Sequence, residues 1–190
     1  MKEVLAIRWH GRGGQGAKMA SFLLAECALE EGKWSQGFPD YGPERSGAPV
    51  RGFNRISDHR IDIHSPITDP DIVIVLDDTL IGKVDVCGGL KENGICIVNT
   101  QCDPATMRSR LKLNGRRLFT VDATTIALDE IGRPIPNTAM FGALAKASGV
   151  LKLETIVREI QKRFKKKFGV EVAEQNVKAV RRAYSEVKGE

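Results

Sequence analysis

The chain has 190 residues, of which 42% are hydrophobic and 28% are charged, so it is long enough for one domain with a real core and ordinary in composition for a globular protein. No stretch approaches the roughly 18 apolar residues that a membrane span needs, which argues against a membrane protein. The opening "MKEVLAIRW" is too brief for a secretory signal, and we therefore expect a cytoplasmic location.

The net charge of +5 comes from residues 151–190. The few aromatic residues in this segment fit helical apolar positions, so we expect a solvated face or a subunit contact there. A nucleic-acid-binding module, suggested by "KRFKKKFG" (162–169), remains an alternative. The chain contains four cysteines, at positions 27, 87, 96 and 102. No C-x-x-C pair occurs, so we expect reduced thiols and no metal site.

The first elements form half of a βαβ unit. The apolar run Val4–Trp9 predicts a buried strand, and the apolar stripe within Ala17–Leu29 predicts a helix that ends near Gly32. Residues 33–49 have no period and are rich in Gly and Pro, which predicts a long loop. The sequence that follows, 50–63, predicts a hairpin of two short strands around Asp58-His59.

The rest of the chain alternates between strand and helix patterns. Three short β-branched runs are typical of parallel strands covered on both faces: 71–77, 94–100 and 117–123. Helical patterns lie between them or follow them, at 79–92, at 104–112, from about residue 137, at 153–164 and at 173–187. We therefore expect a single α/β domain over residues 1–190. Its predicted architecture is three-layered and Rossmann-like, with a mostly parallel sheet, one hairpin insertion and a helical C-terminus.

The segment "GRGGQG" (11–16) matches G-x-G-x-x-G and lies between a predicted strand and a predicted helix. Such a turn lets a phosphate approach main-chain N–H groups at a helix N-terminus, although it also serves simply to pack helix against strand. A dinucleotide site requires an acidic residue at the end of the next strand. Asp40 is in range by count but lies between Pro39 and Tyr41 in the irregular segment. The NAD interpretation is weakened, and a phosphate-bearing ligand remains.

Catalytic patterns are missing from the sequence. His10 is adjacent to the glycines, and a structural role is favoured for it over a ligand contact; His59 and His64 belong to no metal-ligand spacing. Neither G-x-S-x-G nor G-x-x-x-x-G-K-[ST] occurs. From its residues alone, the chain is a binding domain without catalytic residues or a metal site of its own.

Two further segments accompany "GRGGQG" in a fixed order, "YGPERSGAPVRG" (41–52) and "PNTAMFGALAKASG" (136–149). This combination resembles the gamma subunit of pyruvate:ferredoxin oxidoreductase, also called pyruvate synthase, and its 2-oxoacid oxidoreductase relatives, over essentially the whole chain. The resemblance implies oxidative decarboxylation of a 2-oxoacid with coenzyme A, giving an acyl-CoA, CO2 and reduced ferredoxin. Pyruvate is the expected acid; 2-oxoisovalerate or another 2-oxoacid is the alternative, and one gamma subunit could serve more than one enzyme.

The resemblance also implies a division of labour. Thiamine diphosphate with its Mg and the 4Fe-4S clusters belong to partner subunits, and this chain helps to bind and position coenzyme A. Ferredoxin is reached through the complex, and the isolated chain is expected to be inactive. An NAD(P)-dependent dehydrogenase domain is the second alternative.

The implied site combines the glycine turn with three other places. The turn would present N–H groups to a coenzyme A phosphate; the "GPERSG" segment would meet an anionic group or the facing subunit; and the polar residues after the second of the three β-branched runs and before the helix at 137 would line the site. The expected coenzyme A-binding residues are Arg12, Gly13, Gly14, Gln15, Gly16, Arg45, Ser46, Asn99, Asn137 and Thr138.

Overall fold

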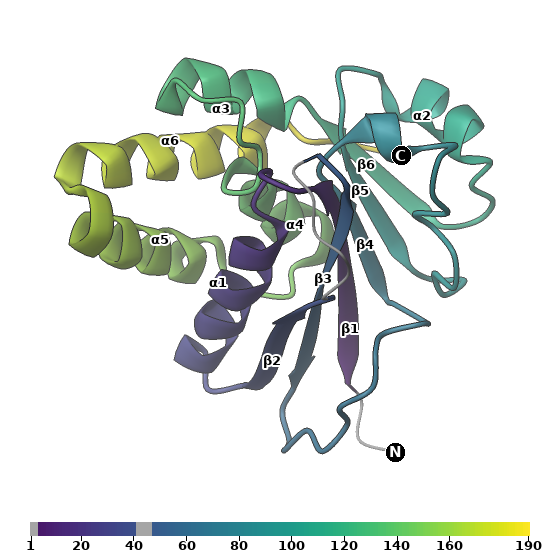
Figure 1. Ribbon diagram of the computed structural model, residues 1–190, viewed down its shortest axis with the longest axis horizontal. Coiled ribbons are helices and arrows are strands. Elements are labelled where there is room, and N and C mark those ends of the chain that lie inside the picture. Colours follow the sequence, from purple (N-terminus) through teal and green to yellow (C-terminus); the bar gives the residue numbers. More distant parts are fainter. Residues whose placement is uncertain (1–3, 41–46) are drawn as a thin grey trace.

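The computed structural model describes residues 4–40 and 47–190. They form one seven-stranded sheet in the order β2-β3-β1-β4-β5-β6-β7 (Figure 1). The strands are β1 (Leu5–Arg12), β2 (Trp34–Pro39), β3 (Pro49–Ser57), β4 (Ile72–Val75), β5 (Ile95–Asn99), β6 (Arg117–Val121) and β7 (Lys188–Gly189). Strands β1, β4, β5 and β6 are parallel, whereas β3 and β7 run against their neighbours. The prediction of an α/β fold with a mostly parallel sheet is confirmed.

Helices cover the sheet unequally. They are α1 (Ala17–Glu30), α2 (Pro104–Leu111), α3 (Ala123–Ile131), α4 (Ala139–Ser148), α5 (Leu153–Phe168) and α6 (Val170–Glu186), with a short 3₁₀ helix, η1 (Asp78–Leu80). Helices α1, α3, α4, α5 and α6 gather on one side of the sheet, and α2 lies on the other (Figure 1). The helical C-terminus predicted from periodicity is therefore confirmed, and α5 and α6 pack beside α1 and α4. No helix in residues 4–40 or 47–190 has the length and apolar character to cross a membrane.

Strand β4 shows why these runs form the centre of the sheet. Its four β-branched residues are all buried, and they alternate between the two cores. Ile72 and Ile74 pack with the helical side, while Val73 and Val75 pack against the α2 side. Side chains of a strand point to opposite faces in turn, so a continuous apolar run fits a strand covered on both faces.

The hairpin predicted around Asp58-His59 is wrong. Strand β3 ends at Ser57, and residues 58–71 form no strand. Its antiparallel partners are β1 and β2, and β2 occupies part of the segment predicted to be a loop. Strand β2 does not alternate apolar and polar side chains, and helix α1 lies very close to it. A Cβ on Gly37 would lie 2.4 Å from the carbonyl oxygen of Ser21 in α1, so only glycine fits there.

The helix predicted over 79–92 is also wrong. Only the short η1 forms, and the remainder is a series of turns. The apolar residues that suggested helical spacing, Leu80, Val86 and Leu90, are buried in the second core all the same. The segment is held by Arg8, whose guanidinium donates to the carbonyl oxygens of Val86 and Gly88. The spacing of apolar residues over 79–92 therefore reflects the packing of turns onto the sheet and does not indicate a helix.

Candidate functional site

The glycine turn connects β1 to α1 and needs left-handed backbone at two of its residues. Gly14 has φ 99° and Gly16 has φ 85°, values that L side chains rarely adopt. A Cβ on Gly16 would lie 2.3 Å from Nδ2 of Asn137, so this glycine allows the loop before α4 to pack against the start of α1. A Cβ on Gly14 would meet no atom of the described residues within 4 Å, so none of these residues covers the main chain there.

Backbone hydrogen bonds hold the turn against the segment that enters β3. The N–H of Gly13 donates to the carbonyl oxygen of Ala48 at 2.9 Å, and the N–H of Gly47 donates to the carbonyl of Gly13 at 3.3 Å. Within the described ranges, no side-chain hydrogen bond caps the N-terminus of α1. The first N–H groups of a helix have no partners within the helix, and they carry partial positive charge. The start of α1 therefore presents partial positive charge to the turn.

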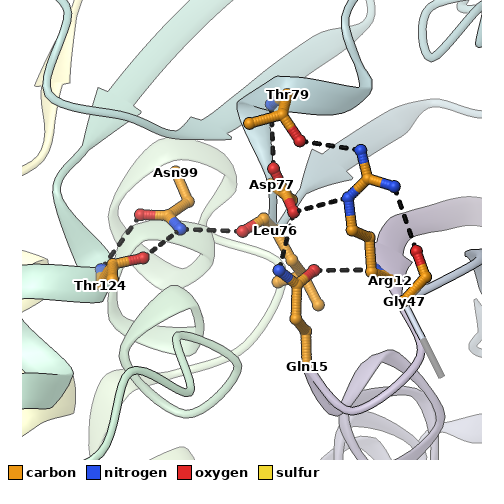
Figure 2. A network of polar contacts seen from close by, with 8 residues as sticks. All are labelled: Arg12, Gln15, Gly47, Leu76, Asp77, Thr79, Asn99 and Thr124. Atoms are coloured by element: carbon orange, nitrogen blue, oxygen red, sulfur yellow. Dashed lines mark hydrogen bonds and ion pairs between the residues drawn. The ribbon is translucent and has the colours of Figure 1, made fainter. Parts of the chain in front are cut away.

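Arg12 and Gln15 meet at Asp77, which follows β4 after one intervening residue, Leu76 (Figure 2). Oδ2 of Asp77 accepts from Nε of Arg12 at 3.0 Å and from Nε2 of Gln15 at 2.8 Å, while Oδ1 accepts from the N–H of Thr79 at 2.9 Å. Burial raises the pKa of the Asp77 carboxyl, but the hydrogen bonds from Thr79 and Gln15 and the charge of Arg12 outweigh burial and lower the pKa below its ordinary value.

A groove of about 620 Å³ lies over the turn, between α1, the ends of β2 and β3, and the C-terminal half of α5. Five of its lining residues are cationic: Arg12, Lys18, Arg51, Arg163 and Lys167. Three are phenylalanines: Phe22, Phe164 and Phe168. The remaining lining residues are Gly13, Gly14, Gly16, Ala17, Met19, Pro39 and Val50. Among the described residues no carboxylate lines this groove; the acids that pair with Arg51 and Arg163, Asp40 and Glu26, lie outside it.

The aromatic side chains of the groove are accessible. Phe168 is 51% exposed and Phe22 is 36% exposed. Nζ of Lys167 lies 5.1 Å from the ring centre of Phe168, and the rings of Phe164 and Phe168 are 5.7 Å apart. The groove thus combines positive charge with open aromatic faces.

A second cavity, of about 350 Å³, shares Met19, Phe164 and Phe168 with the groove and is also lined by Asn137 and Thr138. Nδ2 of Asn137 donates to the carbonyl oxygen of Gly16 at 3.4 Å, and its Oδ1 accepts from the N–H of Thr138 at 2.9 Å. Asn137 therefore links the glycine turn to the start of α4.

The structure distributes the predicted site residues over these places. Arg12, Gly13, Gly14 and Gly16 line the groove, whereas the side chain of Gln15 contacts Asp77. Asn137 and Thr138 line the second cavity. Arg45 and Ser46 lie outside the described residues.

Asn99 is buried at the carboxyl end of β5 and lines neither cavity. Its Nδ2 donates to the carbonyl oxygen of Leu76 and to Oγ1 of Thr124, both at 2.8 Å (Figure 2). In the structure Asn99 thus connects the residue after β4 to the start of α3 by hydrogen bonds.

Sequence reasoning did not assign Asp77 to the site, and it considered the α5 residues Arg163, Lys167 and Phe168 only within the segment that suggested nucleic-acid binding. Asp77 carried a signal, because it follows an apolar strand at the sheet edge where open α/β folds bind ligands. The α5 residues carried none beyond their charge, since only packing brings them to the turn.

No group of three or more His, Cys, Asp or Glu residues in the described ranges is placed to hold a metal ion. All four cysteines are free. His10 is buried and accepts from Nε of Arg8 at 3.0 Å through its Nε2, and it does not line the groove.

Residues 6–186 match the family model described as pyruvate ferredoxin/flavodoxin oxidoreductase. The chain belongs to this family. It is 52% identical over 187 residues to pyruvate synthase subunit PorC of Thermotoga maritima, covering 98% of this chain and 96% of that relative. It is 48% identical over 185 residues to the common gamma subunit of the pyruvate/ketoisovalerate oxidoreductases of Pyrococcus abyssi, covering 97% and 98% of the two chains.

The crystal structure of pyruvate oxidoreductase subunit PorC from Thermotoga maritima superposes with a TM-score of 0.88 at 47% identity, covering 99% of both chains. The resemblance stated from three sequence segments is confirmed by these comparisons. The chain is thus a gamma-type subunit of an oxidoreductase, and other subunits are its partners.

Proposed function

We propose that this chain binds and positions coenzyme A in a pyruvate:ferredoxin oxidoreductase complex that converts pyruvate and coenzyme A to acetyl-CoA and CO2 and reduces ferredoxin. The relatives of matching length are named as subunits of pyruvate synthase, which supports pyruvate as the acid. In this proposal residues 1–190 act as one domain. The location is cytoplasmic, in keeping with four free cysteines.

The observation that carries the proposal is the groove over the glycine turn. Coenzyme A joins a purine ring to phosphate groups and a long thiol arm. The main chain at Gly14, which none of the described residues covers, and the partial positive charge at the start of α1 suit a phosphate. Cationic side chains of the groove suit the same charge, and the exposed rings of Phe22 and Phe168 suit a planar base.

The expected roles of the remaining residues are part of this proposal. Arg12, Gly13, Gly14, Gln15 and Gly16 form the phosphate turn, and Asn137 and Thr138 extend the site into the second cavity. Asn99 supports the site from the carboxyl edge of the sheet. Arg45 and Ser46 are assigned to the site on the resemblance alone.

The proposal leaves the reaction itself to other subunits. Thiamine diphosphate with its Mg and the iron–sulfur clusters would lie on partner chains, where decarboxylation and electron transfer would occur. This chain would hold the nucleotide end of coenzyme A so that its thiol reaches the partner's reaction centre. Positioning of this kind lowers a barrier without any catalytic group on the positioning chain.

A second acid substrate has a specific observation in its favour. The relative from Pyrococcus abyssi is named as a subunit common to pyruvate and ketoisovalerate oxidoreductases. Since the proposed groove recognises coenzyme A and not the acid, one gamma subunit could serve both reactions.

The proposal is tested by reversing one charge in the groove. Lys167 lines the groove, whereas Lys166, its neighbour on α5, is exposed and does not line it. We expect Lys167→Glu to raise the Kd for coenzyme A, measured by calorimetry on the full chain and as KM in the assembled complex, about tenfold, or about 1.4 kcal/mol.

Lys166→Glu is the matched control and should leave the Kd within about twofold of the parent protein's value, because its charge faces solvent. Equal effects of the two variants would contradict a groove site. Binding of NADH, with no binding of coenzyme A, would instead support the dehydrogenase alternative.

A further inference from the structure

A single carboxylate, that of Asp77, holds both polar side chains of the glycine turn (Figure 2). Its side chain is only 13% exposed. Asp77 lies just beyond the carboxyl end of β4, 62 positions or more along the chain from the residues of the turn that it contacts. It does not line the groove, so it has no direct contact with a ligand there.

Arg12 shows how completely this contact orients the turn. Its Nε donates to Asp77, Nη1 donates to the carbonyl oxygen of Gly47 at 3.1 Å, and Nη2 donates to Oγ1 of Thr79 at 2.8 Å. The guanidinium therefore connects the turn, the segment entering β3 and the residues after β4. Its orientation depends on the Asp77 carboxylate, which accepts from it and from the N–H of Thr79.

Gln15 completes the arrangement. Its Oε1 accepts from the main-chain N–H of Arg12 at 2.7 Å while its Nε2 donates to Asp77. The side chain thus closes a ring around Gly13 and Gly14, which have no side chains of their own to restrict them. Glycine loses more backbone freedom on folding than any other residue, so a glycine turn keeps one shape only if something outside it imposes that shape.

We propose that Asp77 is a positioning residue for coenzyme A: its carboxylate holds the glycine turn in the shape that receives the phosphate. This inference rests on the proposed function of the groove. A preorganised turn binds its ligand more tightly because the ordering cost is met before binding. Loss of the Asp77 carboxylate would therefore weaken coenzyme A binding without changing the chemical step on partner subunits.

A simple counter-charge role makes the opposite prediction. Asp77 lies beside Arg12 and partly neutralises it, so on electrostatics alone removal of its negative charge would strengthen the attraction of the turn for a phosphate. The direction of the change in affinity thus separates positioning from charge compensation.

The experiment compares Asp77→Asn with Asp103→Asn in the assembled complex. Asp103 caps α2 by accepting from the N–H of Thr106 at 2.9 Å, and it lies on the sheet face opposite α1. Asp77 likewise caps η1 by accepting from the N–H of Thr79, so each substitution removes one capping carboxylate. We expect Asp77→Asn to raise KM for coenzyme A about tenfold with kcat within twofold, whereas Asp103→Asn leaves both within twofold.

A second variant keeps the test decisive if Asp77→Asn folds poorly. Gln15→Met removes one arm of the arrangement and leaves the Arg12–Asp77 ion pair in place. It is expected to raise KM for coenzyme A about threefold to fivefold. An unchanged or lower KM in both variants would overturn the positioning role.

Lys167→Glu tells the two proposals apart. If it weakens coenzyme A binding while Asp77→Asn and Gln15→Met do not, the groove binds coenzyme A and the role of Asp77 is wrong. If Lys167→Glu, Asp77→Asn and Gln15→Met all leave coenzyme A affinity unchanged, the proposed function is wrong, and the role of Asp77 falls with it.

Discussion

At the scale of single residues, β1 carries two buried polar side chains on the face away from α1. Arg8 donates to His10 and to carbonyl oxygens of the irregular segments around Thr68 and Val86. Burial, followed by the charges of Arg8 and Arg51, lowers the pKa of His10 to about 3. The histidine is therefore neutral in the folded protein at neutral pH and acts as an acceptor for Arg8.

This pKa makes stability depend on pH. Because the pKa of His10 is lower in the folded chain than its ordinary 6.5, the unfolded state binds the proton more readily between about pH 6.5 and 3. Above about pH 6.5 the titration of His10 therefore does not reduce the free energy of unfolding. As the pH decreases from 6.5 towards 3, this group lowers the free energy of unfolding by at most about 1.4 kcal/mol per pH unit.

His10→Gln tests the effect, since the glutamine Oε1 can accept from Arg8 but does not titrate. We expect the free energy of unfolding, measured by urea denaturation at pH 7, 6, 5 and 4, to fall less steeply in the variant, by about 1 kcal/mol per unit below pH 6. Parallel curves for the two proteins would show that His10 does not stay neutral on folding.

At the scale of elements, helices α4 and α6 approach each other at a glycine. A Cβ on Gly142 would lie 2.0 Å from the carbonyl oxygen of Val180 and 2.8 Å from the N–H nitrogen of Tyr184. Both atoms belong to the α6 backbone, so they cannot move unless the helix moves. The segment "PNTAMFGALAKASG" that marked the family resemblance therefore contains a packing requirement as well as the polar residues near the turn.

Gly142→Ala should destabilise the protein even though alanine favours helix by about 1 kcal/mol. Overpacking against backbone costs about 1–3 kcal/mol, and here the clash is with two main-chain atoms, so we expect a net loss of about 2 kcal/mol in the free energy of unfolding. Thermal and urea unfolding measure it. Lys146→Ala, at an exposed position of the same helix, should change the value by less than about 1 kcal/mol. A stabilised Gly142→Ala variant would contradict the close approach.

At the scale of the whole molecule, the chain has a binding groove and, among its described residues, no metal cluster. A gamma-type subunit with these features is expected to act only through its partners. We expect the isolated chain to give no coenzyme A-dependent CO2 release from pyruvate and no reduction of ferredoxin. Activity should appear when the thiamine diphosphate-binding and ferredoxin-like chains are added. Turnover by the lone chain would contradict the subunit assignment.

The sequence predicted the elements whose character is local. The runs that became β4, β5 and β6 were recognisable because a continuous run of β-branched residues indicates a strand buried on both faces, even when the neighbouring strands are unknown. The segment that became β2 was not recognisable as a strand. Its glycine is required by the close approach of α1, and its proline ends a strand at the edge of the sheet. Likewise the spacing over 79–92 came from contacts with the sheet, made by turns around η1.

The same division applies to the site. By itself the sequence determined the central strands β1, β4, β5 and β6, the glycine turn between β1 and α1, and membership of the oxidoreductase family, because each depends on residues close together in the chain. Only the tertiary structure decided that Asp77 holds Arg12 and Gln15, and that Lys167 and Phe168 of α5 border the turn. Those contacts join residues about 60 to 150 positions apart, and folding selects them through the packing of the whole sheet and its helices.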